Sequence, residues 1–184
     1  MPPAYVAIDR ATQKKGFSMP SQKLTCSLLT TLAASKQAGR FLELGTGTGL
    51  GTACILEGMD KKSTLTSIDF DESLLKIAQE HLGKDTRLTL ELIDGEKWVS
   101  SNLDARFDYI FADTWHGKYL MLDEVLNMLN PGALYIIDDM LPQQNWPPGH
   151  AAKAKKLVKQ LEARKDLKIT KLHWSTGIII AVKL

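Results

Sequence analysis

The sequence predicts a doubly wound α/β fold, with a seven-stranded, mostly parallel sheet that ends in an antiparallel C-terminal hairpin. Two observations lead to this prediction. Short apolar runs rich in β-forming residues alternate with longer segments of helical period, which indicates parallel strands joined by crossover helices. The last two runs are separated only by the short turn "STG", and so short a connection allows only an antiparallel pair.

The predicted elements follow one another regularly along the chain. Strands are expected at 40–44, 64–69, 87–93, 107–113, 133–138, 167–174 and 177–184. Helices are expected at 21–37, 50–59, 71–83, 96–103, 117–132 and 150–166. Asp71 stands directly before an apolar-periodic segment, where a carboxylate suits a helix N-cap, and Asn130-Pro131-Gly132 is typical of a helix end.

Length and composition indicate one ordinary domain at 1–184, with an N-terminal arm over about 1–20 and an N-terminal helix at 21–37. Of the 184 residues, 44% are hydrophobic and 24% are charged. The formal net charge of +2 is too small to imply a nucleic-acid or membrane partner, and no apolar run approaches the length of a membrane span. The two cysteines lack metal or redox spacing, which favours a reducing cytoplasm.

Four glycines stand at alternate positions in "FLELGTGTGLGT", residues 41–52, directly after the first predicted strand. Alternate glycines make a poor strand and a poor helix, but at the carboxyl edge of a parallel sheet they let a ligand approach the backbone closely. The spacing matches neither the dinucleotide fingerprint G-x-G-x-x-G/A nor the phosphate loop, which requires a Gly-Lys pair. What remains is the pattern acidic-x-Gly-x-Gly-x-Gly, from Glu43 to Gly49.

This pattern resembles the first motif of the class I S-adenosylmethionine-dependent methyltransferases, and the resemblance extends from about Gly16 to Leu184. It implies a Rossmann-like methyltransferase domain, with Asp69 in "SIDFD" on the ribose hydroxyls of S-adenosylmethionine and Asp94 in "IDGEKW" beside the adenine. The alternative is a glycine turn with two helix-capping acids. The cofactor-binding residues that the resemblance implies are Met19, Glu43, Gly45, Thr46, Gly47, Gly49, Asp69, Phe70, Asp94, Gly95, Asp113 and Trp115.

The segment "FADTWHGKY", followed by "YIIDDML", resembles the cation-dependent O-methyltransferases of the catechol and caffeoyl-coenzyme A type. The resemblance implies a divalent ion held by Asp113, Asp138 and Asp139. Three carboxylates form a hard oxygen site that favours Mg²⁺, Ca²⁺ or Mn²⁺ over zinc, and the ion would acidify the hydroxyl to be methylated. Asp139 stands where the family usually has Asn, which adds a negative charge. The alternative is that these aspartates only end strands.

His116 stands where the same family has the lysine that removes the substrate proton. We therefore expect His116 to act as the catalytic general base, with a helix cap as the alternative. Trp115 resembles a tryptophan of the family that packs against the adenine. Met19 matches a family segment beside the methyl donor, where it would make a soft contact to the sulfonium. Trp146, within 142–150, stands where it would wall an acceptor pocket.

The expected function is transfer of a methyl group from S-adenosylmethionine to an oxygen of a small hydroxylated, catechol-like acceptor, with help from a divalent ion. Two alternatives stay open. One is methylation of a hydroxylated RNA base, with phosphates held by Lys153, Lys155, Lys156 and Lys159. The other is a cofactor-binding module without catalysis. A homodimer is left open, and no membrane partner is expected.

Overall fold

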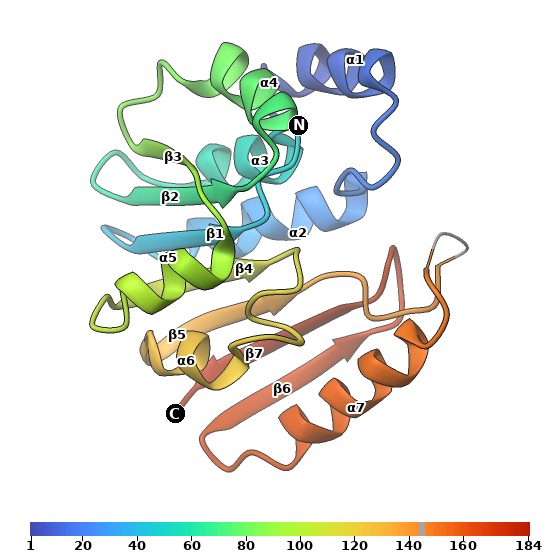
Figure 1. Cartoon of the computed structure of the whole chain (residues 1–184). Helices are drawn as coiled ribbons and strands as arrows, with labels where there is room; N and C mark the ends of the chain where they lie inside the picture. The colour runs from blue at the N-terminus through green and yellow to red at the C-terminus, as the bar shows by residue number, and fades with distance from the viewer. Residues whose placement is uncertain (144–145) are drawn as a thin grey trace.

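The computed structural model describes residues 1–143 and 146–184, and its named strands form one seven-stranded sheet in the order β3-β2-β1-β4-β5-β7-β6 (Figure 1). The strands are β1 (Arg40–Leu44), β2 (Thr64–Asp69), β3 (Leu88–Leu92), β4 (Phe107–Ala112), β5 (Leu129–Ile137), β6 (Leu167–Leu172) and β7 (Ile178–Lys183). Strands β1 to β5 are parallel, whereas β7 runs antiparallel to both β5 and β6. The predicted doubly wound sheet and its C-terminal hairpin are confirmed.

The helices cover both faces of this sheet. They are α1 (Tyr5–Lys15), α2 (Lys23–Ala34), α3 (Leu50–Gly58), α4 (Glu72–Leu82), α5 (Gly95–Ser101), α6 (Leu122–Asn127) and α7 (His150–Glu162). One buried cluster packs α5, α6 and α7 against the sheet, and the other packs α1, α2 and α3 against the opposite face. No helix in the described ranges combines the length and the apolar character needed to cross a bilayer.

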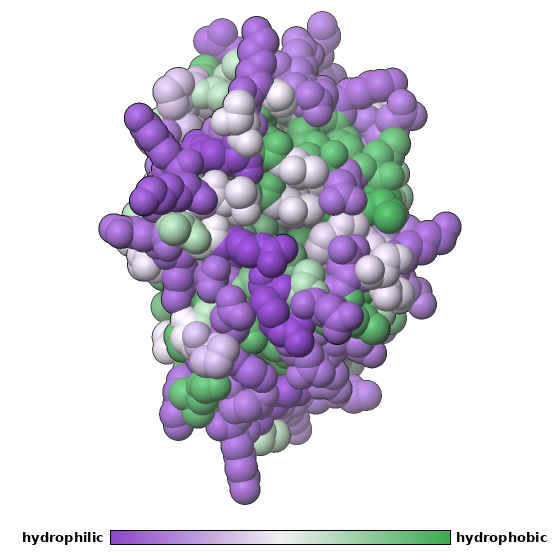
Figure 2. Space-filling view, turned by 90° about the vertical axis from the view of Figure 1, so that its left-hand side faces the viewer, coloured by the Kyte–Doolittle hydropathy of each residue, from purple (hydrophilic) through white to green (hydrophobic). Residues whose placement is uncertain are grey.

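The central strands are buried on both faces, as expected for parallel strands between two helix layers. In β1, Leu42 and Leu44 pack into one cluster and Phe41 into the other, because successive side chains point to opposite faces. Figure 2 shows one outer face of the molecule, on which hydrophilic residues predominate and hydrophobic ones form smaller groups. The two hydrophobic clusters lie between the sheet and its helices.

The helix predicted at 117–132 is wrong over most of its length, since only Leu122–Asn127 form α6. Gly117 and Met121 have φ values of +81° and +54°, and a right-handed helix cannot contain such left-handed residues. The segment Asn130-Pro131-Gly132 lies within β5 rather than at a helix end.

The N-terminal arm contains a helix, α1, that the sequence did not predict. Tyr5 and Ile8 are buried in the second cluster, and the Thr12 hydroxyl donates a hydrogen bond to Thr48 Oγ1 at 2.7 Å. Thr48 belongs to the glycine-rich segment, so α1 is tied directly to that loop.

The N-cap predicted at Asp71 is confirmed. Its Oδ1 accepts hydrogen bonds from the backbone N–H groups of Ser73 at 2.8 Å and Leu74 at 3.2 Å. These contacts satisfy two of the N–H groups that the first turn of α4 leaves without helical partners.

Candidate active site

Two neighbouring cavities lie at the carboxyl ends of β1 to β5. The first cavity has a volume of about 240 Å³ and is lined by the glycine-rich loop, the ends of β2 and β4, and the segment 17–21. The second cavity, of about 90 Å³, is lined by segment 18–22, the ends of β4 and β5, Trp146 and Thr176. Because Met19, Pro20, Ser21 and Asp113 line both, the two cavities adjoin.

The glycines of the loop serve two different purposes. Gly47, with a φ of +53°, lines the first cavity, and a Cβ atom there would contact only the Phe17 ring, at 3.4 Å. Gly49, with a φ of +96°, precedes α3 and does not line the cavity; its Cβ would lie 2.9 Å from that of Ala78 on α4. Gly47 therefore leaves room for a ligand, whereas Gly49 lets the chain pack closely against α4.

Asp69, the last residue of β2, lies at the edge of the first cavity and also holds the loop in place. Its Oδ2 accepts a hydrogen bond from the Gly47 N–H at 2.7 Å, and its Oδ1 accepts one from the Asp71 N–H at 2.9 Å. A carboxylate has about four acceptor positions, so these two bonds leave capacity for ligand hydroxyls. Phe70 lines the same cavity and is 72% exposed.

Glu43 lies beneath the loop, fully buried, and does not line the first cavity. Its Oε2 accepts hydrogen bonds from the hydroxyls of Thr52 and Ser67, both at 2.5 Å, and Ser67 in turn contacts Thr46 Oγ1 at 2.6 Å. Its Oε1 has no hydrogen-bond partner among the described residues. Burial raises the pKa of Glu43 to about 7, although the Ser67 and Thr52 hydroxyls oppose the shift.

Gly95 and His116 form the end of the first cavity nearest α5, and Asp94 lies next to them in the chain. Asp94 caps this helix by accepting hydrogen bonds from the N–H groups of Glu96 at 3.0 Å and Lys97 at 3.2 Å, and it does not line the cavity. Gly95 and His116 do line it, and they pack so closely that a Cβ on Gly95 would lie 2.5 Å from His116 Nδ1. His116 is not among the residues around the second cavity.

Trp115 lies outside both cavities, in an aromatic group on the surface. It is 42% exposed and packs edge-on against Tyr119 and His150, at ring-centre distances of 5.7 and 5.8 Å. The Lys153 ammonium lies 4.3 Å from the centre of the Trp115 ring. Trp146 packs against His150 and lines the second cavity.

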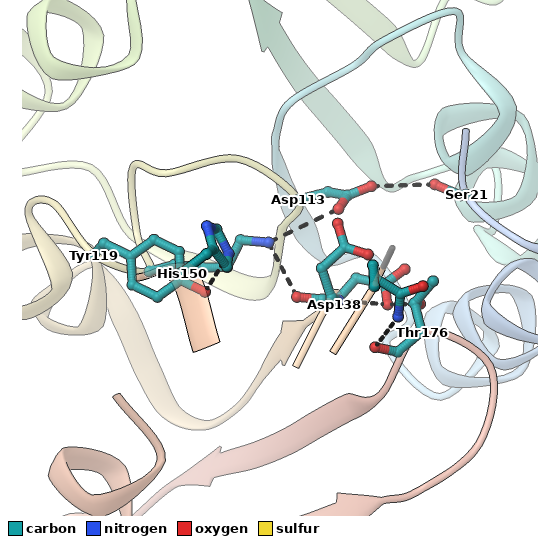
Figure 3. A network of polar contacts seen from close by, with 9 residues as sticks. Ser21, Asp113, Tyr119, Asp138, His150 and Thr176 are labelled. Carbon is teal, nitrogen blue, oxygen red and sulfur yellow. Dashed lines mark hydrogen bonds and ion pairs between the residues drawn. The ribbon is translucent and has the colours of Figure 1, made fainter. Parts of the chain in front are cut away.

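The second cavity is rich in carboxylates, as Figure 3 shows from close by. Asp113 Oδ2 accepts a hydrogen bond from the Ser21 hydroxyl at 3.3 Å. Asp138 Oδ1 accepts one from the Thr176 hydroxyl and another, at 2.7 Å, from the Asp139 N–H. Asp139 has a left-handed backbone, with a φ of +59°.

Lys118 reaches the same site, although it is not among the site residues expected from the sequence. It is only 5% exposed; its Nζ donates a hydrogen bond to the Asp138 carbonyl oxygen at 3.0 Å and lies 3.9 Å from Asp113 Oδ1. Burial and the charge of Asp138 raise the pKa of Asp113 well above its usual value, and Lys118 opposes that rise. Burial and Asp139 likewise raise the pKa of Asp138.

The expected divalent ion does not fit this arrangement of side chains. In the part of the chain that the structure describes, no three His, Cys, Asp or Glu side chains are grouped so as to hold a metal. Any ion on Asp113 would share this carboxylate with the Lys118 ammonium, which also donates to the Asp138 carbonyl oxygen, and Asp138 Oδ1 already has two donors. The first cavity, in contrast, fits S-adenosylmethionine, because Gly47 leaves space and Asp69 offers free acceptor capacity.

The structure thus divides the predicted site residues into three sets. The first cavity brings together Met19, Gly45, Thr46, Gly47, Asp69, Phe70, Gly95, Asp113 and His116. The second cavity is lined by the predicted metal ligands Asp113, Asp138 and Asp139. Neither cavity is lined by Glu43, Gly49, Asp94 or Trp115. Within 142–150, residues 144–145 lie outside the described residues.

A glycine-lined cavity at the carboxyl edge of this sheet, with an acid at the end of β2, defines a class I S-adenosylmethionine-dependent methyltransferase. In agreement, a family of methyltransferase domains matches residues 42–140, more than half of the chain, and the chain belongs to that family. The resemblance noted in the sequence is confirmed.

Individual proteins are similar to this chain in fold or in sequence. The O-methyltransferase TomG from Streptomyces achromogenes, solved with S-adenosylmethionine, has a TM-score of 0.86 at 20% identity, over 100% of this chain and 90% of that chain. An O-methyltransferase of Aspergillus hancockii is 28% identical over 71% of this chain and 54% of its own length. A polyamine aminopropyltransferase of Prochlorococcus marinus (strain MIT 9515) is 32% identical over 48% of this chain. The chain spans 33% of that relative's length.

Proposed function

We propose that this methyltransferase transfers the methyl group of S-adenosylmethionine to a hydroxyl oxygen of a small hydroxylated acceptor. The observation that carries the proposal is the shared border of the two cavities, at Met19, Ser21 and Asp113. A methyl donor in the first cavity would face an acceptor in the second. The name of the Aspergillus hancockii relative, an O-methyltransferase, supports oxygen as the methylated atom.

In the proposed reaction, the carbon–sulfur bond of the sulfonium breaks as the new oxygen–carbon bond forms, and S-adenosylhomocysteine leaves. The hydroxyl proton passes to a base. The main task of the protein is to align sulfur, methyl carbon and oxygen. The carboxylates of the second cavity would accept hydrogen bonds from acceptor hydroxyls, and the Trp146 ring offers a flat apolar wall for an aromatic acceptor.

Cofactor binding is the first test. Asp69→Ala removes the acceptor of the Gly47 N–H and of the ligand hydroxyls, so the affinity for S-adenosylhomocysteine should fall by about 1–3 kcal/mol, or roughly 5- to 150-fold. Calorimetry with the purified chain measures this. Asp60→Ala is the control, because Asp60 caps a turn near Ala38 and does not line either cavity. Lack of cofactor binding by the wild type would contradict the methyltransferase proposal.

The acceptor is tested by a mass-spectrometric screen for methylated products across monophenols, catechols and aliphatic alcohols. We expect S-adenosylhomocysteine to accumulate together with a singly O-methylated product, and Trp146→Ala to raise KM for aromatic acceptors. Methylation confined to amines would overturn oxygen as the acceptor atom. Tight cofactor binding without turnover on any acceptor would favour a non-catalytic binding module.

A hydroxylated RNA base is the second candidate acceptor. Lys153, Lys155, Lys156 and Lys159 are exposed on α7, and Lys153 contacts Trp115 close to the second cavity. If these lysines hold phosphates, the affinity for RNA should fall steeply with salt concentration. Salt-independent turnover of a small acceptor would argue against this candidate.

A further inference from the structure

We infer that Lys118 is a resident cation, which takes the position between Asp113 and Asp138 where related sites would hold a divalent ion. The second cavity then works without an added metal. The inference rests on the proposed function for its chemistry, but its main test does not require turnover.

The loop after β4 fixes the direction of Lys118. The Trp115 carbonyl accepts hydrogen bonds from the N–H groups of Lys118, Tyr119 and Leu120, at 3.1, 2.8 and 3.1 Å. The Tyr135 hydroxyl, buried in the sheet, donates a hydrogen bond to the Gly117 carbonyl. The chain on the amino side of Lys118 is therefore held against the core.

Gly117 makes this course of the chain possible. Its φ is +81°, and a Cβ atom there would lie 2.9 Å from Leu44 Cδ1 and 3.0 Å from the Tyr135 hydroxyl. A residue with a side chain would push the loop off the sheet. The loop therefore packs tightly, and the lysine that follows extends inward rather than into solvent.

Burial makes the position of the ammonium specific. A charged side chain that is 5% exposed is costly unless opposite charge and hydrogen-bond acceptors surround it. Lys118 has both, since its Nζ donates to the Asp138 carbonyl oxygen at 3.0 Å and lies 3.9 Å from Asp113 Oδ1. Exposed lysines move among many conformations, whereas the Lys118 ammonium is held between the Asp113 carboxylate and the Asp138 carbonyl oxygen.

A divalent ion and this ammonium would compete. Both need the negative charge of Asp113 and Asp138, and two positive charges a few ångströms apart in a buried site repel each other strongly. Asp138 Oδ1 already accepts hydrogen bonds from the Thr176 hydroxyl and the Asp139 N–H, so its partners are groups of the protein itself. Lys118 acts through these carboxylates, so it is a positioning residue: it holds Asp113 at the border of the two cavities.

The test is a titration of the full chain with Mn²⁺ in the presence of S-adenosylhomocysteine. Calorimetry measures the affinity for Mn²⁺. Lys118→Met removes the charge and leaves the three aspartates uncompensated, so this variant should bind Mn²⁺ at least about tenfold more tightly than the wild type. Lys118→Gln is a second uncharged variant that can still donate to the Asp138 carbonyl. Lys76→Met is the matched control, because Lys76 pairs with Glu72 on the exposed surface at 3.1 Å and should not change Mn²⁺ binding.

The outcomes separate this inference from the proposed function. Affinity for S-adenosylhomocysteine reports whether each variant is folded and whether the chain binds the cofactor at all. Wild-type protein that binds Mn²⁺ as tightly as Lys118→Met would overturn the inference, and so would folded Lys118 variants that gain no affinity. Once the screen provides an acceptor, wild-type turnover should persist in excess chelator, and its loss would also overturn the inference.

Discussion

The first cavity is built around a glycine-rich loop that is continuous in the sequence, whereas the polar contacts around the second join segments far apart in the chain. Gly45, Gly47 and Thr46 follow β1 directly, and Asp69 ends the next strand. Around the second cavity, Ser21 contacts Asp113 across 92 positions, and Thr176 contacts Asp138 across 38. A local motif therefore marks the first cavity in the sequence, although residues of the segments 17–21 and 113–116 also line it. No such motif marks the long-range contacts around the second cavity.

The two cavities also differ in electrostatics. Beneath the first, Glu43 is buried among neutral hydroxyls, and burial is the main cause of its raised pKa. Around the second, the charge of one buried ammonium, that of Lys118, acts on Asp113 and Asp138, and the repulsion from neighbouring aspartates adds to the effect of burial on their pKa values. Substitutions in the first cavity should therefore act mainly through the shape of the loop and the affinity for the cofactor. Substitutions around the second cavity should act mainly through the balance of charges.

The largest expected effect is that of Gly47→Val. A β-branched residue resists the left-handed backbone at this position and fills the space beside the Phe17 ring, so S-adenosylhomocysteine binding should weaken by roughly 100-fold or more. Gly132→Val is the matched control: Gly132 also has a positive φ, +77°, but faces open space. Calorimetry measures the affinity of both variants for S-adenosylhomocysteine. Equal affinities would show that the shape of the loop at Gly47 has no special effect on cofactor binding.

Glu43→Gln tests the buried carboxyl beneath the first cavity. Because the pKa of Glu43 in the folded protein is about 7, the folded chain holds a proton that the unfolded chain releases at lower pH. The free energy of unfolding therefore falls as the pH rises from about 4.5 to above 7, by up to about 3 kcal/mol from this group.

The Gln variant lacks this titration and retains an oxygen that accepts from Thr52 and Ser67. Its stability relative to the wild type should therefore increase with pH. Urea denaturation of the cofactor-free protein at pH 5 and pH 8 measures the difference. Parallel pH dependences of the two proteins would show that Glu43 titrates as it does in the unfolded chain.

The sequence predicted those features that depend on residues close together in the chain. The Asp71 cap depends on the second and third residues after it, and the course of the glycine loop depends on adjacent strands. Lys118 was missed because its role depends on Gly117 packing against Leu44 and Tyr135, which no local pattern reveals. Its segment was instead assigned to a helix, because apolar residues of a loop that packs on the core repeat with a helical period.

His116 lies in the first cavity, although the sequence suggested a role at the acceptor, and its replacement sharpens the comparison. The sequence suggested a general base, but the ring packs against Gly95 in the first cavity and does not line the second. We expect His116→Gln to weaken S-adenosylhomocysteine binding several-fold, by about 1 kcal/mol, through the loss of an aromatic wall. An unchanged cofactor affinity with a kcat lowered by roughly 10²–10⁴-fold would instead support the general base.

The smallest expected effect is that of Asp139→Asn. Asp139 has a φ of +59°, a conformation that asparagine and aspartate tolerate better than most residues. The substitution also removes a negative charge that raises the pKa of the neighbouring Asp138. The variant should therefore be slightly more stable at pH 7, by less than about 1 kcal/mol, with a small rise in Tm. The gain should shrink as the pH falls and Asp138 takes up its proton, because the repulsion then disappears.

Asp139→Ala is the control, since alanine removes the same charge but is strained at a positive φ and should be less stable than the Asn variant. An Asn variant no more stable than the Ala variant would show that the backbone at this position tolerates any side chain, and that charge alone decides the stability of the second cavity.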